Sequence, residues 1–158
     1  MSTLSLITLP NPLLRQKTTV VKTTDIVNLQ SLIDDMIETM YSSDGIGIAA
    51  PQVGQSIRLV IIHTDKGALP LINPLILKHS HKTEISEEGC LSVPGIFGLV
   101  HRYTKIKIAA QNRHGEKIRF DATHLFARII QHEIDHIDGI LFIDKMEKKT
   151  SKKGGKYY

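Results

Sequence analysis

Apolar side chains recur at steps of three and four residues between positions 25 and 40, which is the spacing of one helix face. This apolar stripe consists of Ile26, Leu29, Leu32, Ile33, Met36, Ile37 and Met40. Thr24 or Asp25 can cap the start of the helix, and the turn-forming residues 42–45 (Ser-Ser-Asp-Gly) end it. The pattern predicts an amphipathic helix near the N-terminus.

Short runs rich in β-branched residues follow this helix and predict strands. They lie at residues 58–64, 71–77, 82–86, 103–110 and 117–120. Residues 112–116 form a turn signal between the last two runs, which predicts an antiparallel hairpin. Apolar periodicity then returns over residues 122–137 and predicts a second helix, ended by Asp138 and Gly139.

These elements fit a single domain. The chain has 158 residues, of which 41% are hydrophobic and 23% charged, and this is enough to build one core. The sequence contains no repeat and no linker-like segment. We expect an α+β domain over residues 1–146, in which antiparallel β-sheets pack around the second helix and the first helix lies near the N-terminus. Residues 147–158 are expected to form a basic, disordered tail.

The positive charge is concentrated at one end of the sequence. Residues 1–143 contain 14 Lys and Arg and 14 Asp and Glu, so the last 15 residues supply the whole net charge of +4. The lysines of this end are Lys145, Lys148, Lys149, Lys152, Lys153 and Lys156. A charge run is usually a solvated segment, and the balanced remainder argues against a nucleic-acid-binding module.

Several features bear on the compartment. The single cysteine, Cys90, excludes an intrachain disulfide framework and suits a reducing environment. Residues 1–10 lack the features of a secretory signal, and the longest apolar runs are too short to cross a membrane. With no Trp and 5% aromatic residues, a base-stacking surface is not expected. The sequence predicts a cytoplasmic protein without a membrane partner or a sequence-specific nucleic-acid partner.

The second predicted helix contains the sequence His-Glu-Ile-Asp-His at residues 132–136. Two histidines four positions apart project from the same helix face and can bind one metal ion. Glu133 follows the first histidine and can act on a water molecule as general base. The preceding turn is apolar, so the histidines enter the core, where unliganded polar groups are costly. A solvated polar helix face is therefore the weaker interpretation.

A third ligand must come from elsewhere in the chain, because catalytic metals usually have three protein ligands. Cys90 lies in a bent segment bracketed by Gly89 and Pro94 and is the candidate. A lone buried cysteine is also commonly an inert packing residue. The residues alone leave both interpretations open.

Residues 45–52 (Gly-Ile-Gly-Ile-Ala-Ala-Pro-Gln) match a dinucleotide-binding fingerprint, with Asp65 as a possible ribose ligand. A helix precedes the match instead of a strand, and Pro51 prevents a helix from following directly. We therefore reject the dinucleotide interpretation. A glycine-rich segment that lets a ligand approach the backbone, followed by the polar Gln52, is preferred.

Three segments taken together resemble the signature motifs of the peptide deformylase family, in the same order and spacing. They are residues 45–52, residues 88–92 (Glu-Gly-Cys-Leu-Ser) and residues 131–136 (Gln-His-Glu-Ile-Asp-His). The resemblance covers about residues 5–143. Two departures stand out: Phe97 and Gly98 replace a basic residue that some members carry, and no long amphipathic helix follows Phe142.

The resemblance implies a metal centre. Cys90, His132 and His136 would hold one divalent ion, which is Fe²⁺ in the native enzyme and can be replaced by Zn²⁺, Ni²⁺ or Co²⁺. Glu133 would be the general base.

The resemblance also implies the substrate contacts. Gln52 and the N–H of Leu91 would form the oxyanion hole, and the carbonyl of Gly45 would accept a hydrogen bond from the substrate backbone. The apolar pocket for the methionine side chain, with His132 at its base, would be lined by Ile46, Leu125 and Ile129.

The implied reaction is removal of the N-formyl group from the N-terminal formylmethionine of newly made polypeptides, with release of formate. Nascent formyl-Met chains are then the substrates, and the ribosome is a partner that the basic tail could reach. The compartment would be the cytoplasm of a bacterium, or an organelle in a eukaryote. The alternative is a zincin-like metallopeptidase, which needs a third His or Glu ligand downstream, and no histidine follows His136.

Overall fold

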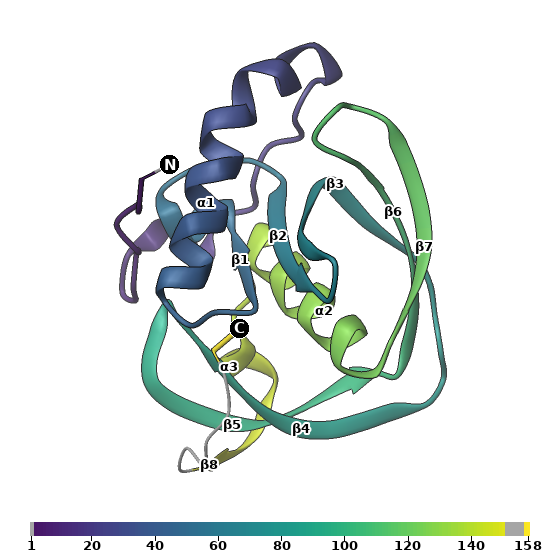
Figure 1. Cartoon of the computed structure of the whole chain (residues 1–158). Helices are drawn as coiled ribbons and strands as arrows, with labels where there is room; N and C mark the ends of the chain where they lie inside the picture. Colours follow the sequence, from purple (N-terminus) through teal and green to yellow (C-terminus); the bar gives the residue numbers. More distant parts are fainter. Residues whose placement is uncertain (1, 151–156) are drawn as a thin grey trace.

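The structure is a computed structural model that describes residues 2–150 and 157–158. Within this part of the chain, the strands form one five-stranded and one three-stranded sheet, and all strand pairings are antiparallel (Figure 1). The first sheet has the order β1 (Gly47–Ala49), β2 (Leu59–Thr64), β3 (Gly67–His79), β6 (Lys105–Gln111), β7 (Lys117–Thr123). The second has the order β4 (Thr83–Cys90), β5 (Val93–Tyr103), β8 (Met146–Thr150). The α+β class predicted from the sequence is confirmed.

The helices are of unequal length. The longest are α1 (Gln30–Ser42) and α2 (His124–Ile137). Shorter helical turns are η1 (Pro12–Arg15), η2 (Thr23–Leu29), η3 (Ala50–Val53) and α3 (Phe142–Lys145). No helix in the described residues is long and apolar enough to span a bilayer.

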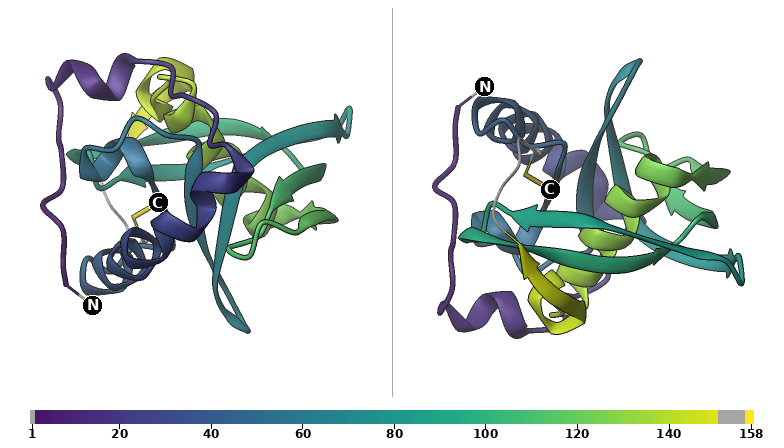
Figure 2. Two further views of the ribbon diagram at one scale, coloured as in Figure 1. Left: turned by 90° about the horizontal axis from the view of Figure 1, so that it is seen from above. Right: turned by 90° about the horizontal axis from the view of Figure 1, so that it is seen from below.

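Helix α2 lies between the sheets, in contact with β1 and β2 on one side and with β5 on the other (Figure 2). Every residue from Ala127 to Ile137 is buried. A helix enclosed in this way can hold polar side chains only if they have partners, so its histidines and acids require a structural or chemical explanation. The predicted central helix is confirmed.

Strand β2 separates two parts of the core. Val60 and Ile62 pack with residues of α2, whereas Leu59 and Ile61 pack with Ile33 of α1 and its neighbours. Because successive side chains of a strand point to opposite faces, a strand covered on both faces is apolar throughout. The continuous apolar run at residues 59–62 therefore reflects burial between α1 and α2.

The boundaries differ from the sequence prediction in several places. The stretch at residues 25–29 belongs to the 3₁₀ helix η2, so the α-helix begins only at Gln30. Residues 122 and 123 end strand β7 instead of starting α2. Strand β5 was predicted only at its last residue, because its glycines and Pro94 obscure the strand pattern.

The expected disorder beginning at residue 147 is wrong for residues 147–150. They belong to β8, which pairs with β5 from Phe97 to Val100. Main-chain pairing at a sheet edge needs no apolar periodicity, so no sequence pattern indicated this strand. Gly98 permits the approach, because a Cβ there would lie 1.9 Å from Sδ of Met146. Tyr157 and Tyr158 are also placed against the domain, and the remaining tail residues, 151–156, lie outside the described residues.

Candidate metal centre and active site

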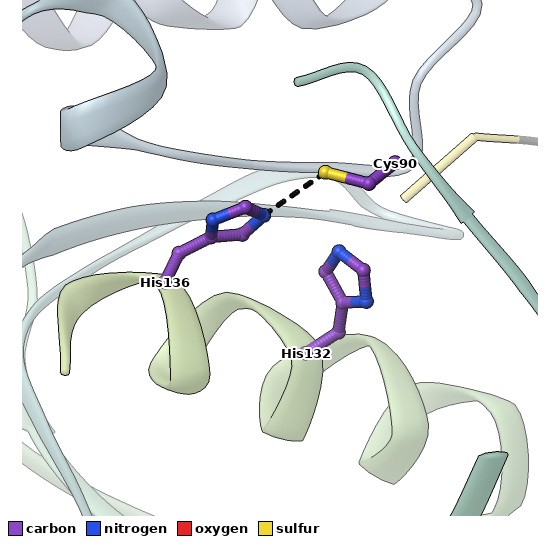
Figure 3. A group of neighbouring side chains, drawn as sticks. All are labelled: Cys90, His132 and His136. Carbon is purple, nitrogen blue, oxygen red and sulfur yellow. Dashed lines mark hydrogen bonds between the residues drawn. The ribbon is translucent and has the colours of Figure 1, made fainter. Parts of the chain in front are cut away.

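Helix α2 presents His132 and His136 one turn apart, and the end of strand β4 brings Cys90 opposite them (Figure 3). One potential ligand atom from each of the three residues lies within 4.8 Å of the others. Sγ of Cys90 is 3.2 Å from Nε2 of His136. All three side chains are buried. The cysteine that the sequence left ambiguous is thus brought to the two histidines.

The donor set suits a divalent transition metal. Nε2 of His132 is buried and has no hydrogen-bond partner among the described residues, and Figure 3 shows it on the side of the ring that faces Cys90. An unpaired buried nitrogen is costly unless something else binds it. One thiolate and two imidazoles are ligands that Fe²⁺, Zn²⁺ and related ions accept. The residues present therefore fit a metal ion.

Burial controls the protonation of these ligands. It raises the pKa of the Cys90 thiol far above its usual range, and the nearby Glu133 carboxylate adds to this rise. It also lowers the pKa of His136, which keeps the imidazole neutral and able to bind a metal. A divalent cation supplies the positive charge that a buried thiolate requires.

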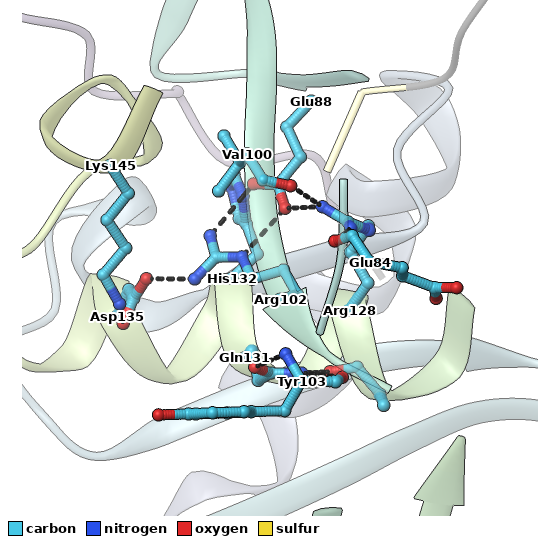
Figure 4. Close-up of polar contacts among 11 residues, drawn as sticks. Glu84, Glu88, Val100, Arg102, Tyr103, Arg128, Gln131, His132, Asp135 and Lys145 are labelled. Atoms are coloured by element: carbon cyan, nitrogen blue, oxygen red, sulfur yellow. Dashed lines mark hydrogen bonds and ion pairs between the residues drawn. The ribbon is translucent and has the colours of Figure 1, made fainter. Parts of the chain in front are cut away.

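The buried carboxylate of Glu88 orients the first histidine (Figure 4). Its Oε2 is 2.8 Å from Nδ1 of His132, and Arg102 donates to both of its oxygens at 2.9 Å. Arg128 adds a further bond to Oε1 at 2.9 Å. Burial raises the pKa of Glu88, but the hydrogen bonds from Arg102 and His132 outweigh it and hold the pKa well below its usual range. An ionised Glu88 can only accept, so Nδ1 of His132 carries the hydrogen and Nε2 is left free to bind a metal.

Sequence reasoning missed this orienting role of Glu88. The residue stands at the start of the motif at residues 88–92, but its partner on α2 is 44 positions away. Arg102 was missed as well; it also bonds Asp135 at 2.5 Å and so ties β5 to α2. The position of Glu88 two residues before the cysteine was the one sequence feature that could have indicated its role. No sequence pattern identified the residues to which it bonds.

Glu133 is fully buried, and neither of its oxygens has a hydrogen-bond partner among the described residues. Burial raises its pKa well above the usual value, and the Glu88 charge contributes to the rise. A Cβ on Gly47 would lie 2.4 Å from Oε1, so the glycine leaves the space that this carboxylate occupies. A carboxylate with raised proton affinity beside potential metal ligands is suited to accept and return a proton.

Gln52 is held beside the cysteine by its own amide. Its Oε1 accepts from the N–H of Ala49 at 2.8 Å, and its Nε2 donates to Oγ of Ser92 at 3.2 Å. The same Nε2 is 3.7 Å from Sγ of Cys90. The main-chain N–H of Leu91, the other expected donor of the oxyanion hole, bonds the main-chain oxygen of Tyr158 at 3.4 Å.

The predicted pocket residues Ile46, Leu125 and Ile129 line one cavity of about 490 Å³. Leu125 is 55% exposed, so it lies at the opening, whereas Ile46 and Ile129 are buried. His132, expected at the base, is not among the described residues that line this cavity. Its ring lies instead against that of Tyr158, with centroids 5.4 Å apart.

The fold and the site together define a metal-dependent hydrolase in which one helix carries two potential ligands and the candidate base. The chain belongs to the polypeptide deformylase family, whose model matches residues 3–152. Members remove the N-formyl group from nascent peptides in a metal-dependent reaction, and the zincin-like alternative is not favoured.

The relatives agree with this assignment over nearly the whole chain. The peptide deformylase of Syntrophomonas wolfei is 46% identical over 145 residues, which are 92% of this chain and 94% of the relative. The crystal structure of peptide deformylase from Thermotoga maritima has a TM-score of 0.89 at 41% identity and covers 93% of this chain and 99% of its own. A class I type b peptide deformylase from Acinetobacter baumannii, solved with Met-Ala-Ser bound, has a TM-score of 0.88 at 34% identity, with coverage of 92% and 100%.

Proposed function

We propose that the chain hydrolyses the formamide of N-formylmethionyl peptides at a centre where Cys90, His132 and His136 hold one Fe²⁺. Zn²⁺, Ni²⁺ and Co²⁺ suit the same ligands and can replace it. The observation that carries the proposal is the convergence of three buried ligand atoms within 4.8 Å, beside the unpaired carboxylate of Glu133. A bound ion of this kind makes water nucleophilic near neutral pH and polarises a carbonyl oxygen.

Glu133 moves the proton in this proposal. It takes a proton from the attacking water as the water oxygen bonds to the formyl carbon. It then delivers that proton to the peptide nitrogen as the carbon–nitrogen bond breaks. The products are formate and a peptide with a free N-terminal amine. The raised pKa of Glu133 favours both the uptake and the return of the proton.

Gln52 and Leu91 stabilise the negative charge that develops on the formyl oxygen. The amide of Gln52 is fixed by Ala49 and Ser92, so it needs no reorganisation during the reaction. The N–H of Leu91 already donates a hydrogen bond to the main-chain oxygen of Tyr158, which supports its role as a donor to the substrate. One such donor contributes about 3–4 kcal/mol to the transition state in comparable sites.

The methionine side chain of the substrate occupies the apolar cavity formed by Ile46, Leu125 and Ile129, and the substrate backbone bonds the carbonyl of Gly45. The cavity volume of about 490 Å³ accommodates a side chain of this size. Binding of Met-Ala-Ser by the Acinetobacter relative supports a methionine-first peptide as ligand.

Formate release from formyl-Met-Ala-Ser tests the proposed function. We expect one formate and one free amine per peptide, full metal occupancy in the purified enzyme, and loss of both metal and turnover in Cys90→Ala. Cleavage of internal peptide bonds without formate release would instead identify a metallopeptidase. Full metal occupancy in Cys90→Ala would disprove the ligand assignment, and elemental analysis of the native protein identifies the ion.

The ribosome is the proposed partner, and the cytoplasm the proposed place of action, because the substrates are nascent chains. Lys145 forms an ion pair with Asp135 at 2.9 Å. Lys148 and Lys149 are exposed on β8, where they can contact phosphates. Replacing Lys148 and Lys149 with Gln should reduce cosedimentation with ribosomes at low salt, since phosphate contacts are salt-dependent. The matched control replaces Lys78 and Lys107 of the five-stranded sheet with Gln. This control should cosediment with ribosomes as well as the native chain does. Equal cosedimentation of both pairs would reject this surface.

A further inference from the structure

Residues 157 and 158 lie in the site that the proposed function gives to the peptide substrate. The N–H of Ile46 donates to the main-chain oxygen of Tyr157 at 3.1 Å, and Gly45 and Tyr157 form a parallel β-bridge. Tyr158 then donates to the oxygen of Gly89 at 3.2 Å. Figure 1 shows this end of the chain at the centre of the molecule, beside β1.

Two of the groups involved are those expected to bind substrate. The N–H of Leu91, a proposed oxyanion donor, bonds the main-chain oxygen of Tyr158. Gly45, whose carbonyl is proposed to bind the substrate backbone, is bridged by Tyr157. The segment therefore runs as a short added strand between the residue 45–46 segment and the end of β4, which is how extended peptides add to a sheet edge.

The side chains of both tyrosines lie beside the residues proposed to bind substrate. Tyr158 is only 7% exposed, packs in the apolar cluster that includes Ile46 and Ile129, and faces the ring of His132. Its burial raises the pKa of the phenol to about 12, so it stays neutral. The ring of Tyr157 packs on Phe97, with centroids 5.5 Å apart.

The hydrogen bonds of Tyr157 and Tyr158 are of a kind that a bound peptide can replace. The two main-chain hydrogen bonds of Tyr158 are 3.2 and 3.4 Å long, at and beyond the upper end of the usual 2.7–3.2 Å range for N–H···O. They use main-chain atoms, which any extended peptide also offers.

We propose that Tyr157 and Tyr158 form an intramolecular competitor of the peptide substrate, which occupies the peptide-binding residues Gly45, Ile46 and Leu91 until a substrate displaces it. This rests on the proposed roles of those residues. Because the segment is tethered to the enzyme, it competes at an effective concentration on the order of millimolar. Occupancy of the site by the segment raises the apparent KM by the reciprocal of the open fraction.

Removal of residues 157 and 158 tests the competition. The shortened enzyme should show a KM for formyl-Met-Ala-Ser about 3–10-fold lower than that of the full chain, with kcat changed by less than about twofold, since a competitor leaves the saturated rate intact. Tyr103→Ala is the matched control, because its ring stacks on His79, away from these residues. An unchanged or higher KM in the shortened enzyme would overturn the proposal.

A second measurement keeps the chain at full length. The sequence contains no tryptophan, so Tyr158→Trp introduces a single tryptophan, which can be excited selectively, at the buried position. Adding Met-Ala-Ser, the reaction product, to the metal-loaded variant should shift its emission to the red and increase quenching by acrylamide. Unchanged emission and quenching at concentrations of Met-Ala-Ser that inhibit turnover would overturn the proposal and leave the proposed reaction standing. Failure to release formate would refute the proposed function instead.

Discussion

At the scale of single residues, the surroundings give two buried glutamates opposite properties. Arg102 and His132 hold Glu88 ionised, whereas Glu133 bonds no cation within the described part of the chain and burial raises its pKa. One carboxylate therefore serves as a fixed acceptor and the other as a proton carrier. The side-chain type alone does not distinguish the two roles.

Glu133→Gln should keep the metal and the fold but lower kcat by about 10²–10⁴-fold, because it removes the proton carrier and leaves the ligands in place. Steady-state formate release and elemental analysis of the same sample measure the two effects. Glu38→Gln on the exposed face of α1 is the control and should be fully active. Near-normal turnover in Glu133→Gln would contradict the mechanism.

The pocket of Ile46, Leu125 and Ile129 should favour formyl-Met peptides, with formyl-norleucine close behind. One methylene changes binding by only about 1–3 kcal/mol, so two unbranched side chains of similar length are poorly separated. Formyl-Asp peptides should be poor substrates, because burying a carboxylate against these three apolar side chains costs free energy. Comparison of kcat/KM for the three peptides checks this order, and equal values for formyl-Asp and formyl-Met would reject the pocket.

At the scale of elements, the site depends on how closely β1 approaches α2. Gly47→Ala should displace Glu133, because the new Cβ would lie 2.4 Å from Oε1 and 2.9 Å from Cγ2 of Ile129. We expect kcat to fall at least about tenfold and the free energy of unfolding to drop by about 1–3 kcal/mol, as for other overpacked cores. Metal content should stay near normal, since the ligands are not touched. Full activity of Gly47→Ala would contradict this prediction, because it would mean that the added Cβ does not displace the Glu133 carboxylate.

The turn α3 is joined to η1 by a pH-sensitive contact. Asp144 accepts from Arg15 at 2.5 Å and from the N–H of Leu141 at 2.9 Å. Burial raises the pKa of Asp144, but these two hydrogen bonds outweigh it and the pKa lies below its usual range. A lowered folded-state pKa stabilises the fold above the unfolded value of about 3.9. This contribution is lost as the pH falls through the folded-state pKa.

Asp144→Asn should therefore be less stable than the native chain near neutral pH, by a small amount because both partners are partly exposed. The difference should shrink below about pH 4, where the native carboxyl becomes protonated. Urea unfolding at several pH values measures it, with the exposed Asp25→Asn as control. A difference that grows as the pH falls would contradict the sign of the linkage.

At the scale of the whole molecule, the metal centre joins parts of the fold that are distant in sequence. Cys90 comes from the end of β4, and the histidines come from α2, so a bound ion fastens the three-stranded sheet to the central helix. Ligands that bind only the folded state stabilise it by mass action.

Metal removal should therefore lower the melting temperature. If the free ion is present at about 100 times its Kd, the loss is about 2.7 kcal/mol, which corresponds to about 5–10 °C for a chain of this length. Calorimetry before and after chelator treatment measures the shift. Cys90→Ala is the control and should melt at the same temperature with and without chelator, whereas an equal shift in both proteins would mean that the ion stabilises the fold from another site.

Features that arise from local spacing could be predicted from the amino-acid sequence. Histidines four positions apart must share a face once residues 124–137 are helical, and the apolar run at residues 59–62 marks a buried strand. These inferences needed only the periods of the helix and the strand. The motif at residues 88–92 indicated the candidate cysteine but left its role open.

Contacts between groups that are distant in sequence became known from the folded chain alone. The pairing of β8 with β5, the bond of Glu88 to His132 and the seating of Tyr158 beside Leu91 each join residues more than 40 positions apart. Main-chain pairing and burial impose no period on the sequence that could reveal such partners. The spacing of His132 and His136 could therefore be predicted from the sequence. The orientation of His132 and the position of Tyr158 beside Leu91 follow from tertiary packing.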